Sequence, residues 1–268
     1  MTSLTRLVET DAHEGPVYVD DDALYFTTQR PDVAIKRLAL ATGDITTVRA
    51  AANVANGMAL DAEGRLIVCE QHPAAITRFD PASGSVETLV HSYDGKPLNS
   101  PNDVVVTRDG AVWFTDPSYG HLQGFRPPPE LTDAVYCYAD GELTMVADGF
   151  DKPNGLAFSP DEDILYVGDN GAPRRIVAFD VDDGRRLANG RVFAHSTREH
   201  PDGLEVDGAG RIYASAAEGV RIYEPTGAQV GDVPLPGAVN FTLGGRDGDA
   251  LFITADDAIW VAALDIRS

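Results

Sequence analysis

The sequence contains two cysteines, few basic residues and no long hydrophobic run. Cys69 and Cys137 are far apart and belong to no CxxC pair, which excludes a disulfide framework and a thiolate zinc site. Lysine and arginine together number 21 against 42 aspartates and glutamates, a net charge of −21. This charge repels nucleic acid and anionic lipid, so neither is an expected partner. A membrane span would need about 18 uninterrupted apolar residues, and none is present.

Several sequence signals of location and chemistry are also missing. The segment MTSLTRLVETDAHEGP has no basic start, apolar stretch or small-residue cleavage site, so we expect a cytoplasmic protein. There is no GxSxG elbow, no GxGxxG and no GxxxxGK[ST], which argues against a serine hydrolase and against nucleotide binding. None of the six histidines forms an HExxH pair.

What the sequence does contain is a repeat of short strands. Runs such as ALYFTT, AVWFTDP and RIYASA are rich in β-branched and aromatic residues and are bounded by Gly, Asp, Asn and Pro, the pattern of β-strands. A polar residue precedes a strand in each of six units, as in EGPVY, NGMAL, NDVVV, NGLAF and DGLEV. We call these polar residues anchors, and they are Glu14, Asn56, Asn102, Asn154, Asp202 and Asn240. Successive anchors are 42, 46, 52, 48 and 38 residues apart.

A period of roughly 40–50 residues built from strands is typical of β-propeller blades. We therefore predict an all-β fold, a six-bladed β-propeller with four-stranded blades around a central channel, over residues 1–268 as a single domain. Residues 240–268 contain three strand-like runs, so we expect LTRLVE at 4–9 to supply the outer strand of the last blade. Two β-sandwiches or a barrel would not explain one polar anchor per repeat.

The anchors are expected to face one another, because the first strand of each blade lines the channel. Turn formation by NG and DG is an alternative explanation of the motif, but Glu14 has no such preference. Two carboxylates and several amide oxygens form a hard donor set that favours a divalent cation, calcium first, with manganese or magnesium next and zinc or iron as further options. Without a cation, Glu14 and Asp202 would raise each other's pKa.

Other candidate residues lie outside the repeat. His13 and His200 adjoin the anchors and are candidates for proton transfer, and His72 is a candidate for the substrate pocket. The segment 116–133 interrupts the repeat with three consecutive prolines and several aromatic residues. We interpret it as a loop, either a surface excursion or a stiff flap over one mouth of the channel.

Four segments in this order carry a family resemblance: EGPVY, SPNDVVV with AVWFTDPSYG, KPNGLAFSPDEDILYV, and HPDGLEVDGAGRIYAS. Together they resemble the gluconolactonase and regucalcin (senescence marker protein) family, whose distant relatives include diisopropylfluorophosphatase. The resemblance implies a catalytic divalent metal in the channel of a six-bladed propeller. It also implies that Glu14, Asn154 and Asp202 are direct metal ligands, and that Asn102 either completes the metal shell or contacts the substrate.

The resemblance bears on only some of the expected substrate contacts. Animal regucalcins usually have an arginine where this chain has Ser100, so their contact with sugar hydroxyls does not carry over unchanged. The substrate-binding residues we expect are Asn102, Ser100, His72, Tyr119 and His200.

The hypothesis from the sequence is a metal-dependent hydrolase that opens a sugar lactone or a similar small lactone. Asp202 is the expected general base, with His200 or a metal-activated water as alternatives. A diisopropylfluorophosphatase-like phosphotriesterase and a non-catalytic calcium-binding propeller are the competing hypotheses. The sequence makes no prediction of oligomeric state.

Overall fold

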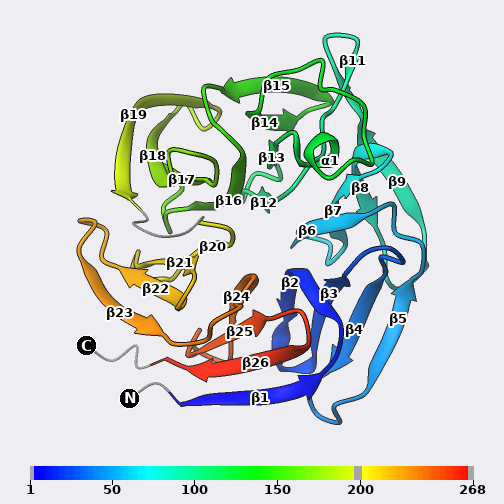
Figure 1. The fold of residues 1–268 in the computed structure, drawn as a ribbon, viewed down its shortest axis with the longest axis vertical. Helices are drawn as coiled ribbons and strands as arrows, with labels where there is room; N and C mark the ends of the chain where they lie inside the picture. The colour runs from blue at the N-terminus through cyan, green and yellow to red at the C-terminus, as the bar shows by residue number, and fades with distance from the viewer. Residues whose placement is uncertain (1–2, 196–200, 265–268) are drawn as a thin grey trace.

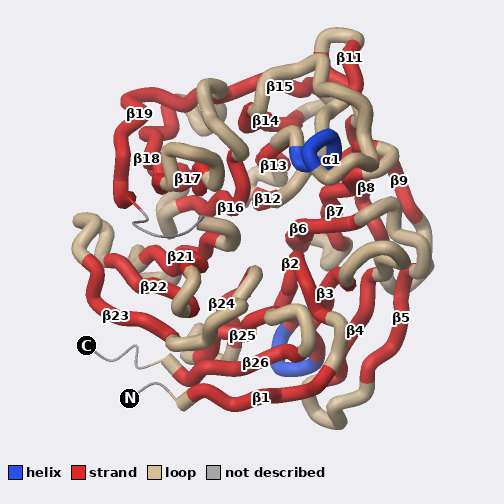
Figure 2. The backbone as a smooth tube through the Cα atoms, in the orientation of Figure 1, coloured by secondary structure: helices blue, strands red, loops and turns tan. Residues whose placement is uncertain are grey.

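The computed structural model describes residues 3–195 and 201–264. Six four-stranded antiparallel sheets stand in a ring around a central axis (Figures 1 and 2). This arrangement confirms the predicted six-bladed β-propeller with four-stranded blades.

The first three blades follow one another along the chain, each ordered from the axis outward. Blade 1 contains β2 (Ala12–Val19), β3 (Ala23–Thr28), β4 (Ile35–Ala39) and β5 (Ile45–Arg49). Blade 2 contains β6 (Ala55–Leu60), β7 (Leu66–Gln71), β8 (Ala74–Phe79) and β9 (Val86–Val90). Blade 3 contains β12 (Val104–Val106), β13 (Val112–Asp116), β14 (Ala134–Ala139) and β15 (Glu142–Ala147).

The next two blades repeat this order, and the sixth departs from it. Blade 4 contains β16 (Pro153–Phe158), β17 (Ile164–Asp169), β18 (Arg175–Asp182) and β19 (Arg186–His195). Blade 5 contains β20 (Leu204–Val206), β21 (Ile212–Ala216), β22 (Gly219–Tyr223) and β23 (Gln229–Val233). Blade 6 contains β24 (Asn240–Gly244), β25 (Ala250–Thr254), β26 (Ala258–Ala263) and, on the outside, β1 (Leu4–Glu9).

Blade 6 joins the two ends of the chain. β1 pairs antiparallel with β26, with Leu4 opposite Ala262 and Glu9 opposite Ala258, and the two strands lie side by side in Figure 1. The prediction that residues 4–9 close the ring is therefore confirmed. Pairing with β1 covers an edge of β26 that would otherwise be open to another strand.

Other secondary structure is sparse. The β10 strand (Ser92–Tyr93) and the β11 strand (Lys96–Pro97) form a small hairpin before blade 3, η1 (Asp20–Asp22) is a single 3-10 turn, and α1 (Tyr119–Leu122) is one helical turn. Over the described ranges, no helix has the length and apolar character needed to cross a bilayer.

The hydrophobic core is divided among the blade interfaces. One cluster of buried apolar side chains lies between each pair of neighbouring blades, and the interface of blades 6 and 1 is an example, with Phe26, Leu38 and Ile259 fully buried. The inner strands β2, β6, β12, β16, β20 and β24 each contact the next around the axis. The core therefore holds six inner strands in a ring and fixes what their side chains present to the axis.

Candidate functional site

A cavity of about 450 Å³ opens at one end of the axis. Its lining includes five of the six predicted anchors, and these are Glu14, Asn56, Asn102, Asn154 and Asp202. The structure therefore brings together the residues that the repeat singled out. It places them in or just before the inner strands, not in hairpin turns.

The glycines of the NG and DG motifs have a packing role at this position. The amide of Gly57 donates to the carbonyl of Asn102, and the amide of Gly155 donates to the carbonyl of Asp202, both at 2.8 Å. A Cβ on Gly57 or Gly155 would clash with the backbone of the neighbouring blade. The motif therefore encodes a close approach between inner strands, and this approach sets each anchor beside the next.

Glu14, in blade 1, is a buried carboxylate that accepts a hydrogen bond from a side-chain amide of blade 6. Asn240 donates through Nδ2 to Glu14 Oε2 at 2.8 Å. Burial raises the pKa of Glu14 to about 8, and the hydrogen bond from Asn240 opposes part of that rise. Asn240 is thus the one anchor that orients another anchor and does not itself line the cavity.

Asp202 is the second carboxylate of the cavity. Its backbone N–H donates to Ser215 Oγ on β21 at 2.8 Å, which fixes the chain just before β20. Burial and, after it, the negative charge of Glu14 raise the pKa of Asp202 to about 8. Within residues 3–195 and 201–264, neither Glu14 nor Asp202 forms an ion pair with a lysine or arginine, although the imidazole of His13 opposes part of the rise in the pKa of Asp202.

The asparagines supply neutral amide oxygens to the lining of the same cavity. Asn102 and Asn154 are both 5% exposed, and Asn154 Nδ2 donates to the phenol oxygen of Tyr119 at 3.4 Å. Asn56 Oδ1 is buried and has no hydrogen-bond partner among the described residues. An unpaired buried carbonyl oxygen is costly, and a bound cation or ligand hydroxyl would satisfy it.

These residues fit a divalent cation by the chemistry of the donor set. Two carboxylates whose pKa is raised by burial lie in one cavity with amide oxygens, one of them unpaired. Divalent cations such as calcium prefer oxygen ligands of this kind. Clusters of three or more His, Cys, Asp and Glu that could hold a metal are not found in the described ranges, so any such site depends on the asparagines.

The segment 116–133 contributes to the cavity wall, although we expected no regular element there. It contains the helical turn α1, and Tyr119 and Gln123 of this region line the cavity. Burial raises the pKa of Tyr119, which keeps its hydroxyl protonated. The segment is therefore part of the site and not only a surface excursion.

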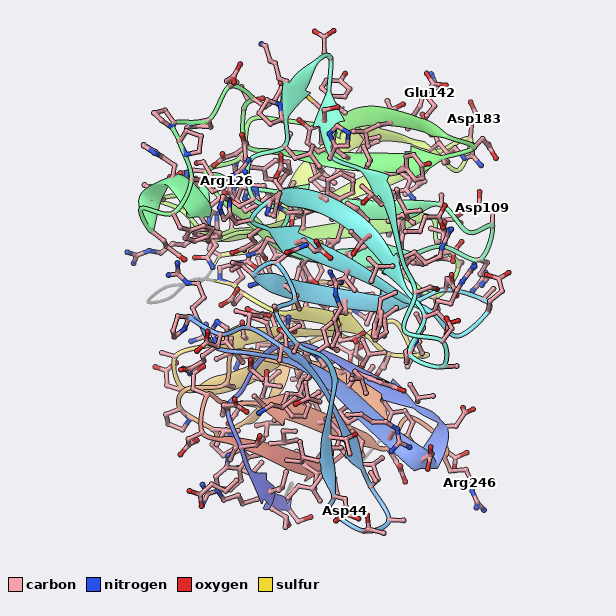
Figure 3. All side chains as sticks on the ribbon, turned by 90° about the vertical axis from the view of Figure 1, so that its right-hand side faces the viewer. Asp44, Asp109, Arg126, Glu142, Asp183 and Arg246 are labelled. Carbon is pink, nitrogen blue, oxygen red and sulfur yellow. The ribbon has the colours of Figure 1, made fainter. Side chains whose placement is uncertain are left out.

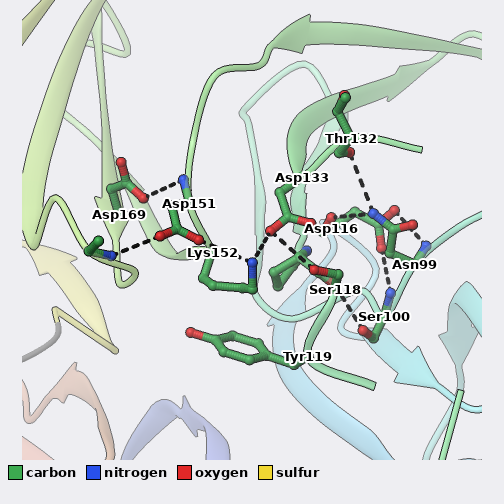
Figure 4. A network of polar contacts seen from close by, with 12 residues as sticks. Asn99, Ser100, Asp116, Ser118, Tyr119, Thr132, Asp133, Asp151, Lys152 and Asp169 are labelled. Carbon is green, nitrogen blue, oxygen red and sulfur yellow. Dashed lines mark hydrogen bonds and ion pairs between the residues drawn. The ribbon is translucent and has the colours of Figure 1, made fainter. Parts of the chain in front are cut away.

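Ser100 lies outside the cavity, contrary to the expectation that it contacts substrate. Its side chain is fully buried; Oγ donates to the carbonyl of Pro117 and accepts from the amide of Gly120, both at 2.8 Å. Its own amide donates to Asp116 (Figure 4). The hydroxyl thus holds the turn that carries Tyr119, because it donates to one residue of that turn and accepts from another.

A second network holds the other end of the same segment (Figure 4). Asp133 accepts from Lys152 Nζ at 2.7 Å and from Ser118 Oγ at 3.3 Å. Lys152 precedes Asn154 by two residues, so this ion pair ties the start of blade 4 to the segment that presents Tyr119.

The two remaining substrate candidates differ in outcome. His72 is exposed and is absent from the cavity lining, although its ring packs against Phe125 with the ring centres 6.3 Å apart. His200 lies outside the described residues. His13 does line the cavity, and its Nδ1 is 2.7 Å from Asp256 Oδ1.

Sequence reasoning missed an acidic layer beneath the anchors. Asp103 and Glu205 line a smaller cavity of about 60 Å³ together with Asn240, and burial raises the pKa of each carboxyl to about 7. A signal was present, since Asp103 directly follows the anchor Asn102 and Glu205 lies three positions after the anchor Asp202.

Comparison with known proteins is consistent with this geometry. Residues 12–257 match the model of the "SMP-30/Gluconolactonase/LRE-like region". A gluconolactonase of Zymomonas mobilis is 33% identical over 214 residues, which are 75% of this chain and 60% of that protein, so the match spans less than two thirds of this relative. The pentonolactonase XacC of Haloferax volcanii is 27% identical over 94% of this chain and 84% of its own.

A solved structure extends the similarity to the whole fold. A gluconolactonase from Xanthomonas campestris superimposes with a TM-score of 0.90 at 38% identity, covering 98% of this chain and 90% of that one.

Proposed function

Because this chain belongs to the SMP-30/gluconolactonase/LRE-like family, we propose that it hydrolyses sugar lactones or related small lactones with the help of one divalent cation. The observation that carries the proposal is the convergence of Glu14 and Asp202 with amide oxygens in one cavity. Relatives named for gluconolactone and pentonolactone hydrolysis support the substrate class.

Glu14, Asn102, Asn154 and Asp202 would hold the cation, with calcium as our first candidate. When bound, it supplies a Lewis acid that draws electron density from the lactone carbonyl. Asn240 keeps Glu14 oriented, and removing such a support usually weakens metal affinity or activity.

Asp202 is the proposed general base. It accepts a proton from the attacking water as the carbon–oxygen bond forms, and the same proton can then pass to the ring oxygen as the ester bond breaks. The product is the open hydroxy acid, so oxygen and hydrogen are balanced by the single water consumed. A positive charge beside Asp202 would lower its pKa from about 8 and leave it ionised for this step.

Polar groups on the cavity wall suit a polyhydroxylated substrate. The buried oxygen of Asn56 can accept a hydrogen bond from a substrate hydroxyl, and the Tyr119 hydroxyl can donate one. Because both groups are placed by buried strands or a braced turn, they would orient the ring with little reorganisation.

Chelation is the direct test. The protein is dialysed against a chelator, and lactone opening is followed as proton release at fixed pH, above a blank without enzyme because these lactones also open spontaneously. We expect activity to vanish and to return with one or more of Ca²⁺, Mn²⁺, Mg²⁺ or Zn²⁺. Full lactone turnover in the metal-free protein would contradict the proposal, and turnover of fluorophosphates alone would favour a phosphotriesterase.

A further inference from the structure

The cavity contains one unexpected charge. Arg30, in the connection between β3 and β4, is the one lysine or arginine among the described residues that line it. Its guanidinium carbon lies 4.5 Å from the ring centre of Phe125, a residue of the 116–133 segment. A cation over an aromatic face is held in place without using its N–H groups, which point outward in the guanidinium plane.

Arg30 differs from the other arginines of this acidic chain. Most of them pair with carboxylates, as Arg175 does with Asp169 at 3.0 Å, but no ion pair of Arg30 occurs in the described ranges. Arg126, which follows Phe125 in the chain, instead donates to the carbonyls of Asn99 and Leu98 at 3.0 and 2.6 Å. Arg30 thus keeps its hydrogen-bond donors available at the mouth of a polar cavity.

The positive charge of Arg30 indicates that its ligand is an anion. Arg30 brings a positive charge to this cavity in a protein whose net charge is −21. An overall negative field repels anions, and a local positive site is then needed to bind one. A guanidinium binds carboxylate or phosphate through two parallel hydrogen bonds.

We propose that Arg30 binds an acidic group on the substrate, a carboxylate or a phosphate, at the end of the molecule remote from the lactone carbonyl. This inference rests on the proposed lactonase function and narrows its substrate class to acidic sugar lactones. Phe125 holds the guanidinium at the rim while the carbonyl end lies at the floor beside Glu14 and Asp202.

The test compares three lactones that share a ring: a neutral aldonolactone, its counterpart with a terminal carboxylate, and its counterpart with a terminal phosphate. We expect kcat/KM to be higher for one of the acidic lactones, which identifies the acidic group. Arg30→Met should lower that value about 10- to 100-fold, the usual range for a charge-assisted hydrogen bond, and leave the neutral lactone within about twofold. Arg30→Lys should recover part of the loss, because it keeps the charge and loses the paired donors.

Arg246→Met is the matched control. Arg246 is an exposed arginine in the turn between β24 and β25, on the face of the ring opposite Arg126 (Figure 3). Its replacement removes the same charge and should change none of the three rates. Equal losses on neutral and acidic lactones in Arg30→Met, or no preference in the parent protein, would overturn the inference and leave the lactonase proposal intact.

Binding separates the two proposals if no lactone is hydrolysed. In that case the lactonase proposal fails, and calorimetry with an aldarate and the matching aldonate tests the anion site alone. Tighter binding of the aldarate that Arg30→Met abolishes would support the site, and equal binding of the two acids would refute it.

Discussion

Glu14 in the channel and Asp180 on the surface have similar amide partners and opposite electrostatics. Asn240 donates to Glu14 at 2.8 Å, and Asn189 donates to Asp180 at 2.9 Å. The pKa of Glu14 is raised to about 8 by burial, whereas hydrogen bonds from Asn189 and Arg191 lower the pKa of Asp180. An amide partner is therefore not enough to keep a carboxylate ionised, and loss of water decides the outcome where no cation compensates for it.

The same contrast extends across the ring. Asp103, Asp202 and Glu205 in the channel have raised pKa values, while Asp80 and Asp161 in surface turns have lowered ones. Asp109 and Asp183 lie on the face opposite Arg126 (Figure 3). Most acidic residues thus belong to a hydrated exterior, and a few are held where a positive ion would stabilise them.

The sharpest test of this contrast removes one charge from each region. Glu14→Gln keeps the shape of the side chain and an oxygen that can accept from Asn240, yet loses the charge that would bind the cation. We expect kcat/KM for lactones to fall about 1000-fold or more, with circular dichroism unchanged. Asp180→Asn is the surface counterpart and should stay within about twofold. Near-normal activity of Glu14→Gln would remove Glu14 from the proposed site.

Removing the amide partners should give a smaller difference. Asn240→Ala leaves Glu14 in place without its orienting donor, so we expect activity to fall about 10- to 100-fold, together with weaker metal affinity in a titration. Asn189→Ala removes the matching donor to Asp180 and should have little effect on either quantity. Equal effects of the two variants would mean that the Asn240 contact has no part in the site.

The opposite pKa shifts predict opposite pH effects on stability. Because the folded protein holds protons on Glu14 and Asp202 up to a pKa of about 8, it binds more protons than the unfolded chain above the ordinary carboxyl range. The metal-free protein should therefore lose stability as the pH rises from about 5 to about 8, by about 10 °C in Tm. Asp80 and Asp161, with lowered pKa values, act in the other direction and cost stability only as the pH falls through the acid range.

Thermal scans in chelator, repeated with a divalent ion, measure this effect. The ion should flatten the slope between pH 5 and 8 by about the amount that the free carboxylates contribute. A metal-free protein that becomes more stable over this range would show that the channel carboxylates are already ionised without an ion.

The smallest expected effect concerns a buried hydroxyl and an exposed one. Ser100→Ala leaves the carbonyl of Pro117 and the amide of Gly120 without their partner, so unfolding should become easier by about 1–3 kcal/mol. Ser83→Ala removes an exposed contact with Asp80 and should change stability by less than about 0.5 kcal/mol. Denaturant unfolding measures the free energy of unfolding of each variant. Equal losses in the two variants would mean that water replaces the Ser100 hydroxyl.

The ring and its closure could be predicted because each blade repeats the same local sequence pattern. The anchor and the strand after it recur in every blade, and the strand missing from the last unit pointed to residues 4–9. The convergence of Glu14, Asn154 and Asp202 followed from the same period, since equivalent positions of a closed ring must meet at its axis.

Roles that depend on contacts between distant segments could not be read in this way. Ser100 precedes an anchor and was expected from the sequence to contact substrate, but its buried hydroxyl bonds to residues 17 and 20 positions later. Arg30 belongs to no repeated motif, and its neighbour Phe125 comes from a different blade. Such pairings are set by packing of the blades and leave no spacing pattern in the chain.

The pairing of β1 with β26 also constrains how the protein is made. β1 is synthesised before every other strand of the described chain, and its partner β26 is synthesised after them. Five blades can form from contiguous chain during synthesis, whereas the sixth must wait for the C-terminal strands. Since β2, which carries Glu14, and β24, which carries Asn240, meet across this same junction, Glu14 gains its contact with Asn240 only after all five other blades have been synthesised.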